Sequence, residues 1–214
     1  MALRGTLIKA AVAVAALGVL GVLFVRSARS VRAEPFNVPR DRLSGWTLAI
    51  EPPSSESGVL LGLRPQRALA SNLFNDVFSR TGESLSGPVP PAIPLILKSE
   101  LDAGALSLLG PEALLALARD AGLESAAVVP RCMAERRVSA PGITRQVYFA
   151  LFALPAFDEF RRQVAARLRD SHYAAFDPAA LSPALIVAAS DAAFSRWLPI
   201  RDADKDCFAP IQVQ

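Results

Sequence analysis

Histidine and cysteine are scarce in this chain, whose 214 residues include one histidine, His172, and two cysteines, Cys132 and Cys207. One imidazole cannot build a zinc site without other ligands, and no partner at metal-ligand spacing accompanies it. It would also have to be the base of any His-dependent catalytic triad, and the chain has no Gly-x-Ser-x-Gly nucleophile motif. We therefore predict no metal and no cofactor, and expect His172 to be a helix-end residue that interacts with the carbonyl groups there.

Glycine-rich phosphate loops and paired acids at a recognisable spacing are also absent, which leaves little for general catalysis. Three carboxylates, Asp202, Asp204 and Asp206, are spaced like the start of a calcium-binding EF-hand loop. The rest of that loop fails, because Cys207 stands where glycine is needed and Val213 where glutamate is needed. An EF-hand is excluded, and a solvated acidic turn is favoured over a weak surface calcium site.

A basic excess is absent from most of the chain, although its formal net charge is +3. Residues 1–33 hold five of the 23 Lys and Arg and none of the 20 Asp and Glu, so residues 34–214 carry 18 basic and 20 acidic residues, a net charge of −2. Composition therefore predicts no nucleic-acid partner. The basic residues near the N-terminus are better interpreted as the flanks of a membrane segment.

That segment contains a charge-free run of sixteen residues, from Ala10 to Val25. A helix of this length reaches about 24 Å, which lies between a secretory signal and an ordinary membrane-spanning helix. Three arginines separate the run from the small residues near Ala33, and this favours an uncleaved single-pass anchor over residues 1–33 rather than a cleaved signal. A buried helix of a soluble protein is least favoured, because no polar stripe interrupts the run.

Orientation is not decided by charge, since the counts on the two sides of the run nearly balance. The two cysteines favour an exported domain with a Cys132–Cys207 disulfide, because exported domains commonly pair a sparse even number of cysteines. Two buried thiols acting as small apolar residues are the alternative. We therefore expect a membrane protein whose globular part lies outside the cytoplasm.

The remaining chain predicts an α+β (mixed α/β) domain, in which helices pack on a mixed sheet. Residues 34–45 contain two prolines and no periodicity, so we expect an extended linker before a globular domain over residues 46–214. Apolar runs and turn signals predict strands and helices. The expected strands are 46–51, 58–63, 95–98, 125–138, 143–154, 184–190 and 207–213, and the expected helices are 65–82, 99–109, 110–122, 155–170 and 191–198.

The order of these elements repeats. Residues 46–122 and 125–214 each read as a hairpin, a helix that begins at a proline, a proline-containing loop, a strand and a helix. We interpret them as possible ββαβα-like repeats from an internal duplication, with an unrepeated domain as the alternative. If the duplication holds, the interface between the halves is the first place to look for a ligand.

In the first helix, apolar residues recur at Leu69, Leu73, Phe74, Val77 and Phe78, which predicts one buried face.

Several polar residues have both a binding and a structural interpretation. Ser190 or Asp191 is expected to cap a helix, although amides there can hold an anion. Two arginine clusters are expected to be solvated faces, and an acidic partner or anionic headgroups are the alternative. They comprise Arg161, Arg162, Arg167 and Arg169 on one helix, and Arg131, Arg136 and Arg137 on the second hairpin.

These patterns predict a non-enzymatic binding or assembly domain, anchored in a membrane through its N-terminal segment and serving a protein partner at the cell envelope. An exported, hydrolase-like enzyme with an unrecognised active site is the alternative. A deep pocket lined by acids or serines would favour the enzyme, whereas an exposed apolar patch or an open strand edge would favour partner binding.

Overall fold

The computed structural model describes residues 17–22, 31–52, 56–88, 90–171 and 176–214. Residues 35–214 form one compact unit, and residues 1–34 form a separate one. Of the predicted anchor, only residues 17–22 and 31–33 are described, and both stretches are helical. No helix within the described ranges is long and apolar enough to cross a membrane, and most of the predicted anchor lies outside them.

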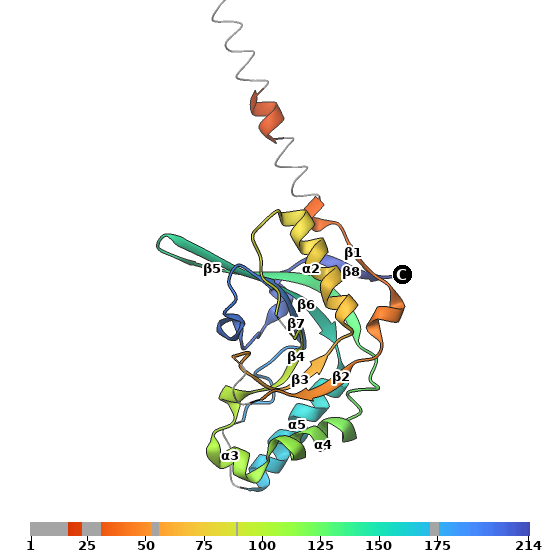
Figure 1. Ribbon diagram of the computed structural model, residues 1–214, viewed down its shortest axis with the longest axis vertical. Coiled ribbons are helices and arrows are strands. Elements are labelled where there is room, and N and C mark those ends of the chain that lie inside the picture. The colour runs from red at the N-terminus through yellow and green to blue at the C-terminus, as the bar shows by residue number, and fades with distance from the viewer. Residues whose placement is uncertain (1–16, 23–30, 53–55, 89, 172–175) are drawn as a thin grey trace, which may run out of the picture. The chain divides into compact units, whose positions relative to one another are not determined.

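The compact unit is a mixed α+β fold, as predicted (Figure 1). Its strands are β1 (Phe36–Val38), β2 (Thr47–Ile50), β3 (Val59–Arg64), β4 (Ile93–Leu97), β5 (Val129–Ala140), β6 (Ile143–Ala153), β7 (Ala184–Ala189) and β8 (Cys207–Val213). Its α-helices are α2 (Arg67–Thr81), α3 (Ala103–Leu108), α4 (Pro111–Asp120) and α5 (Pro155–Asp170). Short 3-10 helices are η1 (Arg40–Leu43), η2 (Lys98–Glu100), η3 (Phe194–Trp197) and η4 (Ala203–Asp206).

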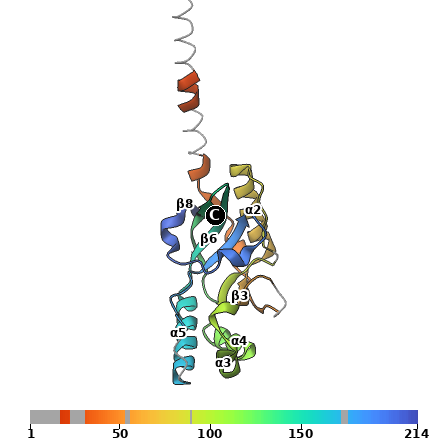
Figure 2. The same cartoon turned by 90° about the vertical axis from the view of Figure 1, so that its left-hand side faces the viewer.

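The strands form two sheets, one with the order β1-β8-β5-β6-β7 and one with the order β2-β3-β4. Among the described strands, only the β1–β8 pair is parallel, and the other neighbours are antiparallel. Helices α3, α4 and α5 gather at one end of the unit (Figures 1 and 2). Buried side chains from both sheets and from α2, α4 and α5 form one continuous core, which explains why the unit does not divide further.

The predicted linker is wrong from residue 36 onward. Phe36 and Val38 are buried on either side of exposed Asn37, and β1 pairs with residues 211–213 of β8. The Phe36 ring is fully buried, and the Arg80 guanidinium lies 3.7 Å from the ring centroid. An alternation of apolar and polar residues over three positions is enough for a strand when a neighbouring strand supplies the hydrogen bonds.

The two predicted repeats share a strand order. In residues 46–122 the order is β2-β3-β4, and in residues 125–214 it includes β5-β6-β7; in each set the middle strand is antiparallel to both neighbours and precedes a helix. Buried Leu69, Leu73 and Val77 of α2 have the spacing of Phe160, Val164 and Leu168 of α5. This common connectivity supports a duplication, which stays a prediction until the halves are superposed.

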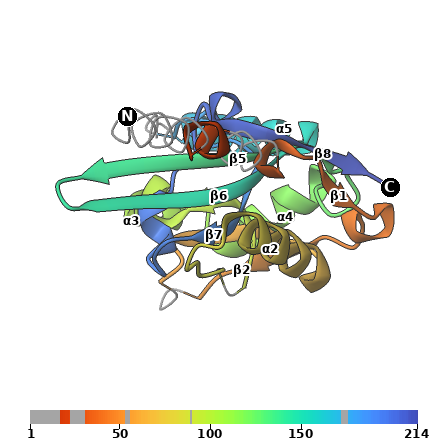
Figure 3. The same cartoon turned by 90° about the horizontal axis from the view of Figure 1, so that it is seen from above.

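Strands β5 and β6 are the longest of the described strands, with 12 and 11 residues, and their hairpin projects from the unit (Figures 1 and 3). Its strands pair from Val129–Ala153 to Ala140–Ile143, whereas β8 pairs with β5 only as far as Ala134 and β7 with β6 only from Val147. Gln146 still bonds Ser190, and beyond Gln146 on β6 and Ala134 on β5 the hairpin is a two-stranded ribbon that pairs with no other described strand.

Candidate binding pocket

A cavity of about 620 Å³ lies between α2, strand β7 and the proline loop, which lines it with Gly87, Pro88, Pro90 and Pro91. Volumes of roughly 300–1,000 Å³ are typical of small-molecule sites. Its walls come from both predicted repeats, because Ile186 and Val187 belong to the second and the other lining residues to the first. The cavity therefore lies at the interface where the duplication predicts a ligand.

Local geometry explains how the proline loop comes to face α2. Ser86 and Ala189 exchange two backbone hydrogen bonds, each 2.8 Å long, which fix the start of the loop to the end of β7. Gly87 then lies so close to its neighbours that an added Cβ would be 3.3 Å from the Phe74 ring and 3.4 Å from the Val187 carbonyl oxygen. The prolines that follow restrict the loop backbone, because each ring fixes φ.

Apolar side chains dominate one part of the cavity. Phe74, Ile186, Val187 and the loop prolines line it. The structure corrects the predicted buried face of α2, because Phe78 is 49% exposed and Phe74 only partly buried. Their rings stack, with centroids 6.4 Å apart and an interplanar angle of 11°. The apolar wall therefore continues from the cavity onto the surface of α2.

Two arginines, Arg64 and Arg67, supply the charge of the cavity, and no acidic residue lines it among the described residues. The Arg64 guanidinium donates to the Glu51 carboxylate over 2.5 Å, and Glu51 is buried. The Arg64 Nε is buried and has no hydrogen-bond partner in the described structure. Arg67 is exposed in the first turn of α2, and no described carboxylate pairs with it. Glu51 offsets only one of the two positive charges.

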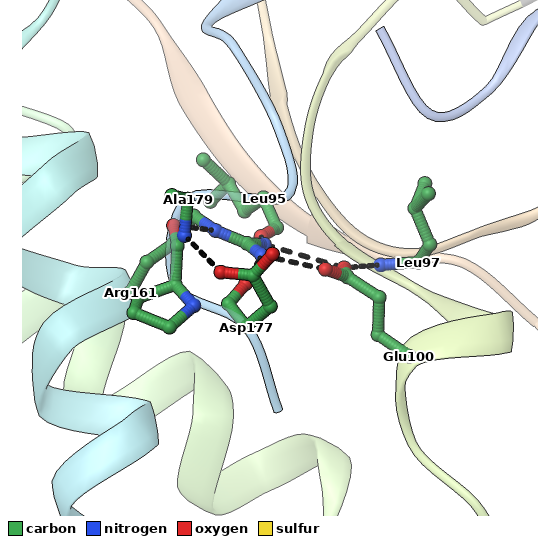
Figure 4. Close-up of polar contacts among 7 residues, drawn as sticks. Leu95, Leu97, Glu100, Arg161, Asp177 and Ala179 are labelled. Carbon is green, nitrogen blue, oxygen red and sulfur yellow. Dashed lines mark hydrogen bonds and ion pairs between the residues drawn. The ribbon is translucent and has the colours of Figure 1, made fainter. Parts of the chain in front are cut away.

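Arg161 of α5 lies in the second predicted repeat, and the sequence wrongly places it on a solvated face. Arg161 is 0% exposed. Its guanidinium donates to both oxygens of Glu100 and to three backbone carbonyls, those of Leu95, Asp177 and Pro178 (Figure 4). Every nitrogen of the guanidinium thus has a partner, which makes Arg161 a structural residue with little capacity to bind a ligand.

If the duplication holds, the place of Arg161 corresponds to this cavity. Arg161 reaches from α5 to the Leu95 carbonyl of β4 and to the loop that precedes β7. The cavity lies between α2, strand β7 and the loop that precedes β4. In this arrangement α2 of the first half lies beside β7 of the second, and Arg161 of α5 in the second half reaches β4 of the first. If buried Leu69 of α2 is matched to buried Phe160 of α5, Ala70 takes the position of Arg161, and Ala70 lines the cavity.

The predicted disulfide is present, and it joins Cys132 of β5 to Cys207 of β8 with their Cα atoms 5.8 Å apart. Those strands are neighbours in the sheet, with Cys132 opposite Pro210 and Ala134 opposite Cys207. The sequence identifies the pair because only two cysteines exist. The register that brings them together depends on pairing between residues far apart in the chain.

The acidic turn and the hairpin arginines, predicted as separate solvated groups, pair with each other. Arg131 donates to Asp204 over 2.7 Å and Arg136 to Asp206 over 2.6 Å. Arg137 pairs instead with Glu135, and this hydrogen bond raises the pKa of the Arg137 guanidinium. No cluster of three metal-ligating side chains occurs among the described residues.

The remaining sequence candidates have local roles or fall outside the described residues. The Asp191 carboxylate accepts the Ala193 amide over 3.1 Å and the Arg196 guanidinium over 3.2 Å. The Ser190 hydroxyl accepts the Gln146 amide over 3.0 Å. The predicted helix over 191–198 is only the short η3. His172 lies outside the described residues, so its predicted helix-end role stays a prediction.

Comparison with known proteins adds no relative, because the chain matches no protein-family model, no curated protein and no solved structure. The interpretation of the cavity therefore depends on its own geometry and chemistry.

Proposed function

We propose that this protein is a non-enzymatic binding domain, and that the cavity between α2, β7 and the proline loop holds a small molecule with an apolar body. The observation that carries this proposal is a cavity of about 620 Å³ whose apolar walls come from two halves of the chain. If the duplication holds, the fully satisfied Arg161 in the corresponding place supports it, because the fold fills that space in one half and leaves it open in the other.

Binding is favoured over the alternative, an exported hydrolase-like enzyme, by the lining of the cavity. General acid–base or nucleophilic catalysis needs positioned titratable groups. The described lining offers Ser71 and Asn75 as neutral polar side chains, two arginines and no carboxylate. A serine without an adjacent base is a weak nucleophile.

The cellular setting is part of the proposal. The disulfide between β5 and β8 supports a domain that faces an oxidising compartment, outside the cytoplasm. The apolar run over residues 10–25 supports attachment to a membrane through the N-terminal segment. Alkaline carbonate washing of membranes tests this attachment. Full-length chain that stays in the pellet supports the anchor, and a soluble chain that begins at Glu34 refutes it.

Photo-labelling tests the binding site directly. The full-length protein is irradiated with a neutral alkyl alcohol that carries a diazirine, and labelled peptides are mapped by mass spectrometry. We expect labels in α2 and β7, and loss of these labels in Ala70→Phe, where the larger ring occupies the cavity. Asn72→Phe is the matched control, because Asn72 is exposed on the same helix and does not line the cavity. Labels that are absent from the wild-type cavity, or unchanged in Ala70→Phe, refute the proposal.

The predicted protein partner at the envelope is a second candidate, favoured by the open edges of the outer β5–β6 hairpin. Val138 and Ile143 there are each 53% exposed, and an open strand edge can accept another strand. A photo-cross-linking amino acid in place of Val138 tests this in living cells. The control position is Leu108 of α3, which is 51% exposed. A discrete adduct from Val138 alone supports a hairpin partner, and equal or absent adducts refute it.

A further inference from the structure

We infer that the ligand of the α2–β7 cavity is a single-chain amphipathic anion, with a carboxylate or phosphate head at Arg64 and Arg67 and an alkyl chain along α2. This inference rests on the proposed binding function and specifies its ligand class. Its basis is a cavity in which positive charge and apolar surface are separated along one helix.

The lining side chains of α2 lie on one face of the helix. Arg67, Ala70, Ser71 and Phe74 recur at intervals of three and four residues, which places them along one stripe, and Phe78 continues it. At 1.5 Å per residue, Phe74 lies about 10 Å and Phe78 about 16 Å along the helix axis from Arg67. A ligand that contacts both ends must be charged at one end and apolar over roughly that length.

The polar end selects an anion. Arg64 is paired with Glu51, whereas Arg67 is exposed and has no described carboxylate partner. A ligand carboxylate or phosphate would offset the uncompensated charge of Arg67 and accept hydrogen bonds from its guanidinium. A cationic ligand would meet two arginines and no acid in the described lining.

The start of α2 strengthens this preference. No acidic residue lies in its first turn, and the N-cap Gln66 makes no side-chain cap hydrogen bond. The Gln66 amide instead donates to the Asp41 and Ser44 carbonyls, over 3.3 and 3.0 Å. The partial positive charge of the helix N-terminus is therefore uncompensated by its own side chains and adds to the field of Arg67.

The apolar end suits one extended chain. Phe74, the loop prolines, Ile186 and Val187 line the cavity, and the stacked Phe74–Phe78 pair extends the apolar wall along α2. An alkyl chain buries its surface there without leaving any polar group unsatisfied. We therefore assign the ligand to free single-chain amphipaths taken up as monomers, rather than to the headgroup layer of a membrane.

The test compares two photoreactive probes of equal length, a diazirine-bearing dodecanoic acid and the corresponding dodecanol, on the full-length chain in nanodiscs of zwitterionic lipid. We expect the acid to label α2 and β7 at a concentration at least about tenfold lower than the alcohol, since a hydrogen bond to a charged group contributes about that factor. Arg67→Gln should remove this difference and Arg67→Lys should retain most of it. Arg169→Gln is the charge-matched control, on an exposed site of α5.

Each outcome separates the ligand class from the proposed function. Equal labelling of the cavity by the acid and the alcohol would refute the anionic ligand class and leave the proposed binding function standing. No labelling of the cavity by either probe would refute both the ligand class and the binding function. An unchanged preference in Arg67→Gln also overturns the inference. Unlabelled dodecanoate should compete with the acid probe, and vesicles of phosphatidylglycerol at equal exposed charge should not. Competition by the vesicles alone would assign the site to a lipid headgroup and refute the inference that the ligand is a free single-chain amphipath.

Discussion

The Arg161–Glu100 pair provides the sharpest test of how this fold is held together. Arg161 is completely buried and Glu100 is 13% exposed, with 2.5 Å between the guanidinium nitrogen and the carboxylate oxygen. Glu100→Gln keeps the size of the side chain but removes its charge, so the guanidinium stays buried with only carbonyl acceptors. Breaking a buried pair on one side costs about 3–5 kcal/mol, and the slight exposure of Glu100 favours the lower end. Typical domains have about 5–15 kcal/mol of stability, so this is a large fraction.

Urea unfolding of the oxidised protein measures this loss. We expect the free energy of unfolding to fall by about 3 kcal/mol in Glu100→Gln. We also expect the Glu100→Gln/Arg161→Met double variant to be less destabilised than the sum of the single changes, because it leaves no unpaired charge. The control is Glu159→Gln, which removes the exposed Arg162–Glu159 pair of the same helix and should cost under about 1 kcal/mol. A Glu100→Gln variant as stable as Glu159→Gln would refute the reasoning.

Three further predictions concern the sheet and the repeats. Replacing Cys132 and Cys207 with alanine should lower the free energy of unfolding by about 4 kcal/mol, the chain-entropy estimate for a separation of 75 residues. Thiol alkylation of the denatured wild type without reductant should label neither cysteine, and two labels would contradict the disulfide. In urea titrations, Phe36→Ala should lower the free energy of unfolding by about 3–5 kcal/mol and Phe78→Ala by under about 1 kcal/mol, because the Phe36 ring is fully buried and the Phe78 ring is not. Equal losses of stability in the two variants would place β1 outside the core. Superposing residues 46–98 on 126–190 should align α2 with α5 and β4 with β7, and helices on opposite faces of the matched strands would end the duplication.

Local sequence patterns predicted most of the elements, because hairpins and amphipathic helices leave a signal within one stretch of chain. The β5–β6 hairpin and α5 are examples, since their alternation, turn residues and helix-starting proline are contiguous. Strand β1 was missed, because three residues between prolines carry little periodicity and their partner lies at the other end of the chain. Only the alternation of Phe36, Asn37 and Val38 could have suggested it.

The cavity and the Arg161 network were beyond prediction for a related reason. Arg161 lies next to Phe160 and four residues after Phe157, on the edge of the apolar stripe, but its burial depends on Glu100 and on three distant carbonyls. The sequence of α2 did contain a sign of the cavity, because its five apolar residues make a stripe wider than packing on one sheet requires. The two residues beyond that requirement are Phe74, which lines the cavity, and Phe78, which extends its wall.

The pairing of β1 with β8 joins the two ends of the compact unit, so that a force on one end is transmitted to the other. The Val38 carbonyl accepts the Gln214 amide over 3.0 Å, and the Gln214 carbonyl accepts the Arg40 amide over 2.9 Å. Because the two strands run parallel, tension that enters along β1 acts along both of them, and their hydrogen bonds share the load rather than opening one at a time. From β8 the force passes through the Cys132–Cys207 bond to β5, in the middle of the sheet. A pull on the N-terminal segment therefore loads β1 first, and it also reaches α2 directly, because Arg80 donates to the Pro35 carbonyl over 2.8 Å and lies over the Phe36 ring.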